Sequence, residues 1–353
     1  MNEVNIYETR TMLSVLEQRV APRTFMRNTF FGAAGTGRTF NTEEVDIDIV
    51  KGKRRLAPFV NPMHEGKLIE KRGYKTRSYK PAYIKPKVVT TAADILKRQP
   101  GNIIYSPNSG PAMFAAEQLG REMADMDDMI IRREEWMVTQ ALLTGTIHVK
   151  GEGVDDVLSF YMDASQLPVL VGTAKWTDHT NATPLDDLKL WKRQRSKASG
   201  YSPTICVLGL AAWDNFMKCE QIIGTTGGGK NLFDMQRIRI GQIDPQMLPN
   251  GVTYCGRLTE LGLDLYTYEE WYVDDDDDME YPMMPENKVF LGNPTARTEF
   301  LYGAIKDIDA LAPVARYPKT WTVPDPSARF MMVQSAPLPV PTEIDAFLTA
   351  TVL

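Results

Sequence analysis

The stretch of this sequence that most suggests chemistry is a glycine-rich segment, GTTGGGKN, at residues 224–231. It has the spacing G-x-x-x-x-G-K of a loop whose backbone amides and lysine hold nucleotide phosphates. In such a loop a Ser or Thr follows the lysine and binds Mg²⁺, but here that residue is Asn231, so a magnesium ligand is missing. The residues that would form the loop are Gly224, Gly227, Gly228, Gly229 and Lys230.

The segment before this loop also bears on the choice, because a phosphate-binding loop needs a strand that delivers its glycines to the start of a helix. Residues 210–223 instead carry Trp213, Phe216, Met217 and Ile223, and the steps of three and four from Trp213 to Phe216 and Met217 predict an amphipathic helix. Gly224 then suits the C-cap of that helix. We therefore favour a flexible glycine-rich loop between two helices, and nucleotide binding by this loop is the less favoured alternative.

Residue types that serve metal binding or nucleophilic catalysis are scarce. The chain has three cysteines and three histidines: Cys206, Cys219, Cys255, His64, His148 and His179. Their spacings match neither C-x-x-C nor H-x-x-x-H, and no histidine lies near a G-x-S-x-G. The sequence therefore predicts buried thiols and lacks the usual residues of metal and triad chemistry, which makes an enzyme function the less favoured hypothesis.

A run of five aspartates, residues 274–278, falls between the strand-like segments EEWYV and KVFLGN. Five carboxylates can attract Ca²⁺, but the glycine and the twelfth-position glutamate of an EF-hand loop are absent. We favour a solvated hairpin or loop connection.

Length and composition are those of an ordinary globular protein. With 353 residues, 43% of them hydrophobic, the chain is long enough for two or three folded regions. Its first twenty residues carry acids and arginine where a signal peptide has an uninterrupted apolar core. The longest apolar run, near residues 205–212, is far shorter than a membrane span. We expect a soluble protein that has no membrane partner.

The charge is unevenly distributed along the chain. Residues 51–87 contain 12 Lys or Arg against Glu65 and Glu70, a local balance of +10, whereas the whole chain carries −5, which leaves −15 for the remainder. Before this block, EEVDIDIV alternates apolar and acidic residues as a half-buried strand does. After it, YKTRSYKPAYIKPK has an extended, proline-punctuated pattern. Residues 41–90 are therefore predicted to form a long two-stranded arm with a basic tip.

Two functions are open to such an arm, because a two-stranded ribbon is marginally stable alone and needs a surface to lie on. Basic residues interleaved with tyrosines at 51–87 suit contacts with nucleic-acid phosphates and bases. Alternatively, the arm rests on an acidic neighbouring copy of the same chain.

The clearest single element is a helix predicted from Pro111 to about Leu143. Ser109 is a suitable N-cap, and Pro111 lies in the first turn, where its missing N–H costs nothing. At 1.5 Å per residue the helix is roughly 45 to 50 Å long, which exceeds the usual length in compact domains. Apolar residues recur at spacings of three, four or seven and predict core or interface packing: Met113, Ala116, Gly120, Met123, Ile130, Met137 and Ala141.

The rest of the chain alternates strands and helices without a repeat, which predicts a mixed α+β fold. The expected elements are strands at TIHVK, VLSFYMD and LPVLVG, a helix from Pro184 to about Ala198, a buried strand at 204–208, and strands at VTYCGRL and LDLYTYEEWYV.

The C-terminal fifth carries a family resemblance. Its features are Leu291-Gly-Asn293 with Ala296-Arg297, ARYPK at 315–319 with Trp321, and Asp325-Pro326 with Ala328-Arg329 leading into QSAPL at 334–338. Upstream, YKPAYIKPK and Trp176 occur in the expected order. On these features the chain resembles the tailed-phage major capsid protein E family, the lambda-type major head proteins, over nearly its whole length. The glycine-rich loop and the aspartate run match no motif of that family.

The resemblance implies the α+β capsid fold named after phage Hong Kong 97 and assigns the predicted segments to its parts. Residues 1–40 become the N-terminal arm and 41–90 the extended E-loop. Residues 91–183 become a peripheral domain whose spine helix spans 111–143. The axial domain then covers 184–290, and 291–353 returns to the peripheral domain.

The resemblance implies a structural protein and not an enzyme, without catalytic residue, cofactor or metal. Its copies are expected to assemble into hexamers and pentamers of an icosahedral shell around double-stranded DNA. We expect the basic loop to lie on an acidic part of the spine helix of an adjacent subunit. The expected contact residues are Arg54, Arg55, Lys67, Lys71 and Arg72 on the loop, and Asp125, Asp127, Asp128, Glu134 and Glu135 on the helix. Residues 224–230 are expected near the capsomer centre.

The expected partners are other copies of the chain, scaffold, portal and decoration proteins, and packaged DNA bound without sequence specificity. Covalent cross-linking through Lys67 or Lys71 is disfavoured, because lambda-type relatives generally use decoration proteins instead. The expected location is the virion capsid, after assembly in the host cytoplasm.

Overall fold

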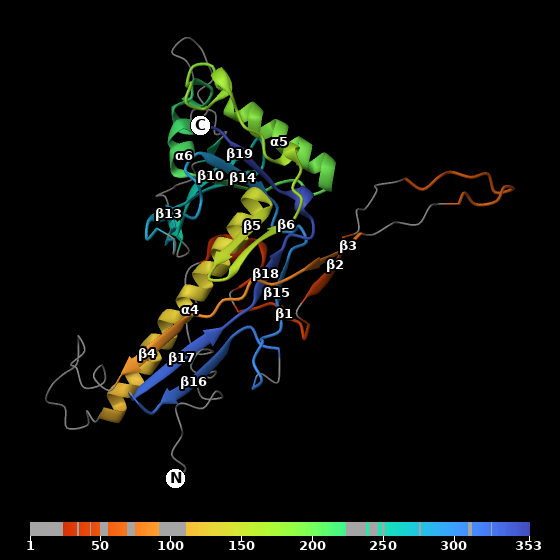
Figure 1. The fold of residues 1–353 in the computed structure, drawn as a ribbon. Coiled ribbons are helices and arrows are strands. Elements are labelled where there is room, and N and C mark those ends of the chain that lie inside the picture. The colour runs from red at the N-terminus through yellow and green to blue at the C-terminus, as the bar shows by residue number, and fades with distance from the viewer. Residues whose placement is uncertain are drawn as a thin grey trace.

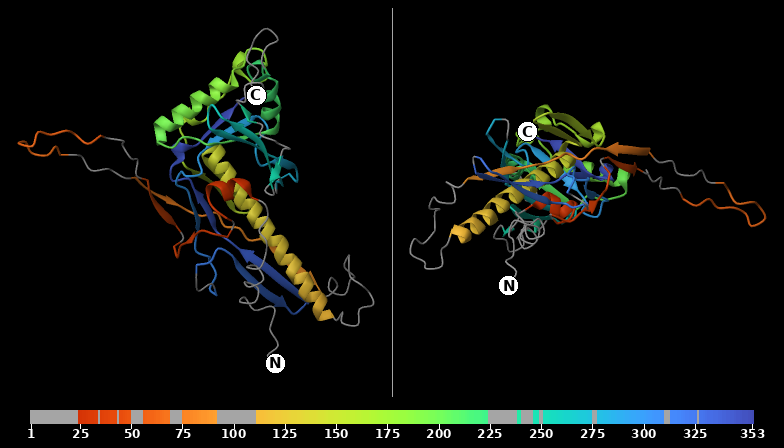
Figure 2. Two further views of the ribbon diagram at one scale, coloured as in Figure 1. Left: turned by 180° about the vertical axis from the view of Figure 1, so that it is seen from behind. Right: turned by 60° about the horizontal axis from the view of Figure 1, so that its bottom comes forward.

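The computed structural model describes residues 24–33, 35–42, 44–49, 56–68, 75–91, 111–223, 238–239, 246–248, 251–274, 277–309, 313–325 and 327–353. These residues form an elongated body with a long helix through it, a sheet region at one end and an arm that projects to the side (Figure 1). The arm stays clear of the body in the two further views of Figure 2. Among the described helices, none combines the length and the apolar character that crossing a bilayer requires.

The long helix α4 (Pro111–Thr144) confirms the predicted spine helix almost to the residue. Its 34 residues make it about 50 Å long. Met123, Ile130 and Met137 are buried, as the apolar spacing predicted. The helix ends at Gly145, whose φ of +69° lies in the left-handed region. A Cβ there would collide with the Cβ of Met162, so the chain requires glycine at this turn.

A seven-stranded sheet forms the end of the body beyond the helix. Its order is β19-β14-β7-β11-β10-β8, with β9 paired to β10. The strands are β7 (Ile205–Leu208), β8 (Ile238–Arg239), β9 (Gln246–Leu248), β10 (Val252–Leu258), β11 (Leu263–Tyr268), β14 (Lys288–Gly292) and β19 (Leu348–Thr351). β7 runs parallel to β11 and antiparallel to β14. The C-terminal strand β19 therefore lies in this sheet, although the resemblance assigned all of 291–353 to the peripheral domain.

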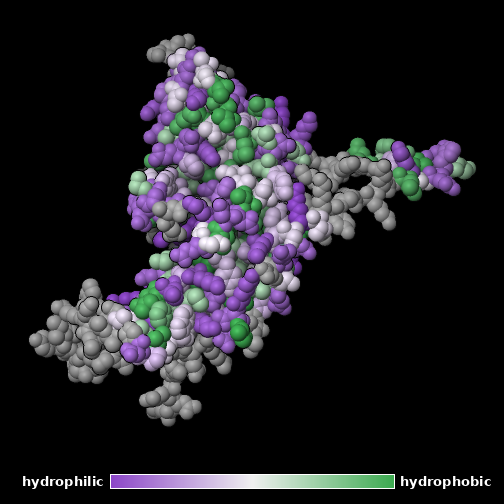
Figure 3. Space-filling model, viewed as in Figure 1, coloured by the Kyte–Doolittle hydropathy of each residue, from purple (hydrophilic) through white to green (hydrophobic). Residues whose placement is uncertain are grey.

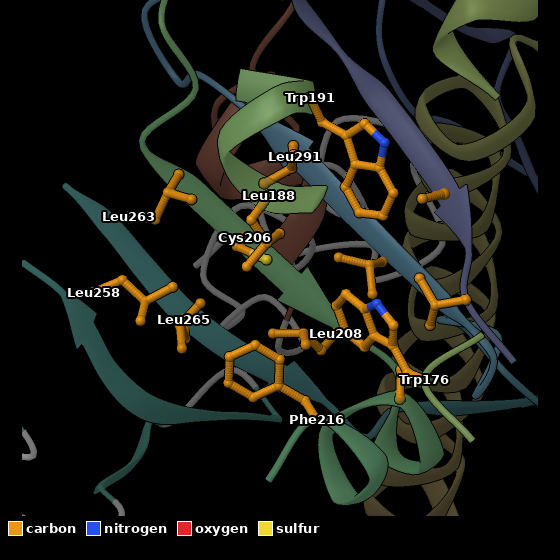
Figure 4. Close-up of a cluster of buried hydrophobic side chains, with 14 of the residues drawn as sticks. Trp176, Leu188, Trp191, Cys206, Leu208, Phe216, Leu258, Leu263, Leu265 and Leu291 are labelled. Atoms are coloured by element: carbon orange, nitrogen blue, oxygen red, sulfur yellow. The ribbon is translucent and has the colours of Figure 1, made fainter. Parts of the chain in front are cut away.

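Three helices accompany this sheet: α5 (Pro184–Ser199), α6 (Leu210–Lys218) and α7 (Glu220–Ile223). Trp176, Trp191 and Phe216 pack with buried leucines of the strands (Figure 4). Trp176 and Trp191 stack with ring centroids 6.4 Å apart. The structure confirms the predicted helix from Pro184 and the strand at 204–208. The helix predicted over 210–223 is divided into α6 and α7, because Cys219 between them has an extended backbone.

A three-stranded sheet lies against the other half of α4. Its order is β16-β17-β4, from β16 (Tyr317–Val323), β17 (Ala328–Gln334) and β4 (Lys87–Thr91). Met331 and Val333 of this sheet pack on Met123, Met126 and Ile130 of the helix. We predicted that the arm comprises residues 41–90, but residues 87–90 do not belong to the projecting arm. They pair with β17, whose residues 328–334 lie far along the chain, so the local sequence pattern could not reveal this pairing.

The remaining elements are short. They are α2 (Phe25–Phe30), β1 (Arg38–Thr39), β15 (Glu299–Tyr302), β18 (Pro337–Val340), the hairpin β5 (Thr146–Gly151) with β6 (Val154–Ser159), the hairpin β12 (Trp271–Val273) with β13 (Glu280–Pro282), and 3₁₀ turns at Ala164–Gln166, Gly172–Ala174 and Ile344–Ala346. The strand predicted at TIHVK is confirmed, but VLSFYMD is strand only at its start. The strand predicted at LPVLVG is wrong, since this segment forms only a bridge from Val169 to Thr351.

Asp274, Asp277 and Asp278 of the aspartate run lie at the turn between β12 and β13, as a hairpin connection was predicted, and the other two aspartates lie outside the described residues. The backbone N–H of Asp274 donates to the carbonyl of Met279 at 3.0 Å, which closes the turn. The hydroxyl of Tyr281 donates to Asp277 at 2.7 Å.

Candidate assembly surfaces

The projecting arm begins with a short antiparallel ribbon. β2 (Val45–Ile49) pairs with β3 (Lys75–Tyr79), with Val45 opposite Tyr79 and Ile49 opposite Lys75. The alternation of apolar and acidic residues in the first strand predicted this pairing. Figure 1 shows the ribbon leaving the side of the body and continuing outward as the arm.

The root of the arm is held by aromatic contacts at the end of β6. The guanidinium carbon of Arg77 lies 3.7 Å from the ring centroid of Tyr161, a cation–π distance. The rings of Tyr79 and Phe160 have centroids 5.5 Å apart. Val45 and Tyr79 are buried in a cluster that also contains residues of the spine helix. These contacts fix the direction in which the arm leaves the body.

The described part of the arm tip, residues 56–68, is irregular and apolar. Leu56, Phe59, Met63 and Leu68 are between 93% and 105% exposed. A local turn is formed where Asn61 accepts from the backbone N–H groups of Met63 and His64, at 3.1 and 2.9 Å. Monomeric proteins rarely expose several large apolar side chains together. The tip is therefore a candidate contact surface.

Our sequence prediction of a basic tip missed this apolar character. Lys67 is exposed on the tip, whereas Arg54, Arg55, Lys71 and Arg72 lie outside the described residues. The signal was present in LAPFV, where the large apolar side chains of Leu56, Phe59 and Val60 lie around Pro58 without helix or strand periodicity.

The acidic residues expected to receive the basic loop separate into two groups. Asp125 is exposed and Asp128 is half-buried. Asp127, Glu134 and Glu135 are buried, with Glu134 at 0% and Glu135 at 1% exposure. The expectation that Asp127, Glu134 and Glu135 meet a neighbouring subunit is therefore wrong, because residues of the same chain already bind these three carboxylates.

Glu134 lies between two arginines. Arg27 of α2 forms a buried ion pair with one carboxylate oxygen, and Arg316 donates to the other at 2.7 Å. Arg316 also binds Asp127 at 3.0 Å. Burial alone would lower the pKa of Arg316, but the charge and hydrogen bond of Glu134 outweigh it and raise that pKa. The network joins the N-terminal helix, the spine helix and the segment before β16.

Glu135 caps helix α2 from outside. Its two oxygens accept the backbone N–H groups of Met26 and Arg27 at 2.8 and 2.9 Å, and it also accepts the hydroxyl of Tyr268 at 2.8 Å. The helix has no side-chain cap from Thr24, so Glu135 supplies the acceptors that its first turn lacks. Burial raises the pKa of Glu135, although these hydrogen bonds act in the opposite direction.

Arg27 makes further contacts between α2 and the rest of the body. It donates to the Tyr302 hydroxyl at 2.9 Å, and its guanidinium lies 4.1 Å from the ring centroid of Phe300. Burial raises the pKa of Tyr302 to about 12, so the hydroxyl keeps its proton at neutral pH. Glu134 and Glu135 are therefore structural residues of one subunit.

The glycine-rich loop, with Gly224, Gly227 to Gly229, Lys230 and Asn231, lies outside the described residues. The chain that leads to it is helical, through α6 and α7, and the strand β7 ends earlier, at Leu208. This is not the strand-to-loop approach that a nucleotide site requires.

Groups suited to metal or thiol chemistry are not assembled in the described part of the chain. There, no three His, Cys, Asp or Glu residues are placed to hold a metal ion. Cys206 and Cys219 are buried, and burial raises the pKa of Cys219 to about 11, which keeps it protonated.

Comparison with known proteins agrees with the resemblance seen in the sequence. The family model of phage major capsid protein E matches residues 8–352. The major capsid protein of Enterobacteria phage P21 is 28% identical over 360 residues, covering 99% of this chain and 100% of the relative. That of Escherichia phage lambda is 28% identical over 359 residues, covering 98% and 99%. The family is one of structural proteins and not of enzymes.

A solved structure shows the fold. A structure described as a prophage capsid protein of Escherichia coli CFT073 superposes with a TM-score of 0.69 at 21% identity, covering 98% of this chain and 99% of that one. The fold is thus the α+β phage capsid fold of the Hong Kong 97 type, as the resemblance implied.

Proposed function

We propose that this chain, which belongs to the phage major capsid protein E family and is a major capsid protein, assembles into hexamers and pentamers that close into an icosahedral shell around double-stranded DNA. The observation that carries the proposal is the arm, which is anchored at its root and apolar and exposed at its tip. An arm of this kind gains little from its own body. It is suited to bury its tip on another copy.

The geometry of the arm favours a ring or a shell over a symmetric pair. The arm leaves one side of the body, and we propose that a different part of the next copy receives it. Such a contact is heterologous, so each copy gives one arm and receives one. Rings close when the rotation between neighbours divides a full turn, and five or six copies satisfy this. Residues 224–230, which follow α7, are proposed to line the capsomer centre.

For the charged part of the contact we propose fewer acidic residues than the sequence suggested. Lys67, together with the basic residues at 54, 55, 71 and 72, is proposed to approach Asp125 and Asp128 on the spine helix of a neighbour. Asp125 is exposed, so an approaching cation can reach it. Such exposed pairs contribute little to affinity, and their main effect is on orientation and salt dependence.

The location follows from the family: a major capsid protein is part of the capsid of the virion. Assembly is proposed to take place in the host cytoplasm, with scaffold, portal and decoration proteins as further partners. Packaged DNA is proposed to touch the inner surface without sequence-specific binding. We propose no covalent cross-link through Lys67 or Lys71, and an SDS gel of boiled particles that shows bands above the monomer would contradict this.

Electron microscopy of the full chain tests the proposal. The chain is expressed with its neighbouring phage genes and imaged in negative stain at moderate salt. We expect uniform hollow particles, or rings and tubes of capsomers. The control replaces residues 56–68 with a Gly-Ser linker of equal length, which should leave the body folded and abolish the particles. A wild-type chain that stays a monodisperse monomer or dimer when concentrated would contradict the proposal.

A further inference from the structure

A pocket of about 550 Å³ opens between the spine helix α4 and the hairpin β12–β13. Met129 and Trp136 contribute from the helix, and Trp271 and Val273 from the hairpin. Met129, Trp271 and Val273 are each about half exposed, so the pocket has an apolar wall that faces solvent in the isolated subunit. An apolar surface of this kind marks a site for another chain segment.

The pocket also lacks one hydrogen-bond acceptor. The indole Nε1 of Trp136 is buried, and within the described part of the structure it has no hydrogen-bond partner. A buried tryptophan N–H usually donates to an oxygen. The ring is held by neighbours of the same subunit, with Tyr272 at 6.3 Å and the guanidinium of Arg133 at 5.3 Å. A segment that brought a carbonyl oxygen into the pocket would complete this site.

The arm tip has what the pocket lacks. In the described part of the structure, residues 56–60 make no backbone hydrogen bond, so their carbonyls are available to a donor. A phenylalanine such as Phe59 buries on the order of 150–250 Å² when it is covered. Together with Leu56, Met63 and Leu68, the tip offers apolar area comparable to one side of a standard interface, roughly 800 Å².

The tip cannot reach the pocket of its own subunit. The hairpin β12–β13 lies on the opposite side of the body from the arm (Figure 1). The root contacts of Arg77 with Tyr161 and of Tyr79 with Phe160 hold the ribbon in that direction. Figure 3 shows hydrophobic atoms on the far end of the arm, separated from the body. Any contact between tip and pocket therefore joins two copies.

We propose that this pocket receives the arm tip of a second copy. Phe59 packs against Met129, Trp271 and Val273, and a backbone carbonyl of the tip accepts the Trp136 indole N–H. The proposal rests on the proposed function and gives its arm a specific receptor.

The charges around the pocket agree with this occupant. Arg132 and Arg133 lie on one wall, and Glu270 and Glu280 on another. The tip carries Glu65 and Lys67, one charge of each sign, so both can find an opposite charge. Because apolar burial dominates the contact, added salt should weaken it little, in contrast to a contact made by the basic loop alone.

Paired cysteines test the proposal in the full-length chain. A57C and V273C are introduced together, so that Phe59 is kept and the first cysteine lies at an exposed position of the same tip. The protein is assembled, and a short bismaleimide joins thiols that lie close. We expect a ladder of covalent dimers, trimers and larger oligomers on an SDS gel, because each copy gives one tip and receives one. The control pair A57C with L190C places the second cysteine on α5 at a similarly exposed apolar position and should give no ladder.

The outcomes separate this inference from the proposed function. Particles seen by electron microscopy without a ladder, or with equal ladders from both pairs, would overturn the pocket and leave shell assembly standing. A product that stops at the dimer would overturn the heterologous contact. If the double variant does not assemble, A57C subunits are mixed with V273C subunits. A covalent dimer is then expected, and its absence contradicts the pocket. A wild-type chain without particles contradicts the proposed function itself.

Discussion

Replacing Glu135 by glutamine should lower the free energy of unfolding of the subunit by roughly 1–3 kcal/mol. The side chain is buried and accepts three hydrogen bonds, two from the backbone of α2 and one from Tyr268. Glutamine has nearly the same shape but a single acceptor oxygen. Its amide group must face at least one of the backbone N–H groups of Met26 and Arg27, which then loses its acceptor.

The magnitude comes from that lost acceptor. A buried donor left without a partner costs about 1–3 kcal/mol. The neutral amide is easier to bury than a carboxylate, so the net loss should lie toward the lower end of that range. Glu135→Ala removes all three acceptors and leaves a cavity, and it should cost about 3 kcal/mol or more.

The assay is urea unfolding of unassembled subunits, followed by tryptophan fluorescence. Asp125→Asn is the matched control, because it makes the same chemical change on the same helix at an exposed position. It should change the stability by no more than about 0.5 kcal/mol. If E135Q were as stable as D125N, Glu135 would not be capping helix α2, and our explanation of how the N-terminal helix is held would be refuted.

Four further predictions concern the pH dependence of stability at Glu135 and at Asp307, the glycine at position 145, and the arm tip. Burial raises the pKa of Glu135, so the folded subunit binds this proton more tightly than the unfolded chain does, and wild type should gain stability over E135Q as the pH falls from neutral toward the ordinary value of 4.5. At Asp307 the hydrogen bond from Lys319 lowers the pKa, so the stability of wild type relative to D307N should fall as the pH is lowered. Urea unfolding at several pH values measures both pH dependences. Stability curves of wild type and variant that stay parallel across pH would contradict them. Gly145→Ala should cost about 2 kcal/mol or more, because it adds a collision with Met162 to the strain of a positive φ, whereas Gly153→Ala at a similar φ in open space should cost about 1 kcal/mol; equal melting temperatures would refute the packing argument. Phe59→Ser should leave subunit stability unchanged within about 0.5 kcal/mol and abolish particle formation seen by electron microscopy, and particles that form normally would show that the tip is not a contact.

The periodicity of apolar residues within single segments predicted the spine helix and the ribbon of the arm. The spine helix follows from apolar residues at helical spacing with Pro111 in the first turn, and the structure has it at Pro111–Thr144. The ribbon of the arm follows from the alternation at Val45 to Ile49. In each case the information lies within one segment, because helix and strand periodicities are properties of neighbouring residues.

Contacts between residues far apart in the chain could not be predicted from the sequence. Glu134 and Glu135 look like surface charges on a helix until Arg27, 107 residues earlier, is seen to pair with Glu134. The strand at Lys87–Thr91 looks like part of the arm until β17 is seen beside it. In both cases the partner is brought by the tertiary fold, and spacing along the chain contains no trace of it.

The apolar character of the arm tip could have been predicted from the sequence. In LAPFV, the large apolar residues Leu56, Phe59 and Val60 lie within the basic segment 51–87. Exposed apolar residues without periodicity require a covering partner, and this argument needs no structure. By contrast, the pocket beside Trp136 combines residues of the spine helix with a hairpin more than a hundred residues later, and it becomes visible only in the folded chain.

The measurement that tests the central claim most directly is a cryo-electron microscopy reconstruction of particles formed by the wild-type chain. We predict rings of five and six subunits in which the arm of each copy leaves its own body and ends on the next copy, beside the spine helix and the β12–β13 hairpin. Arms folded back onto their own bodies, or particles without five-fold and six-fold rings, would contradict the account.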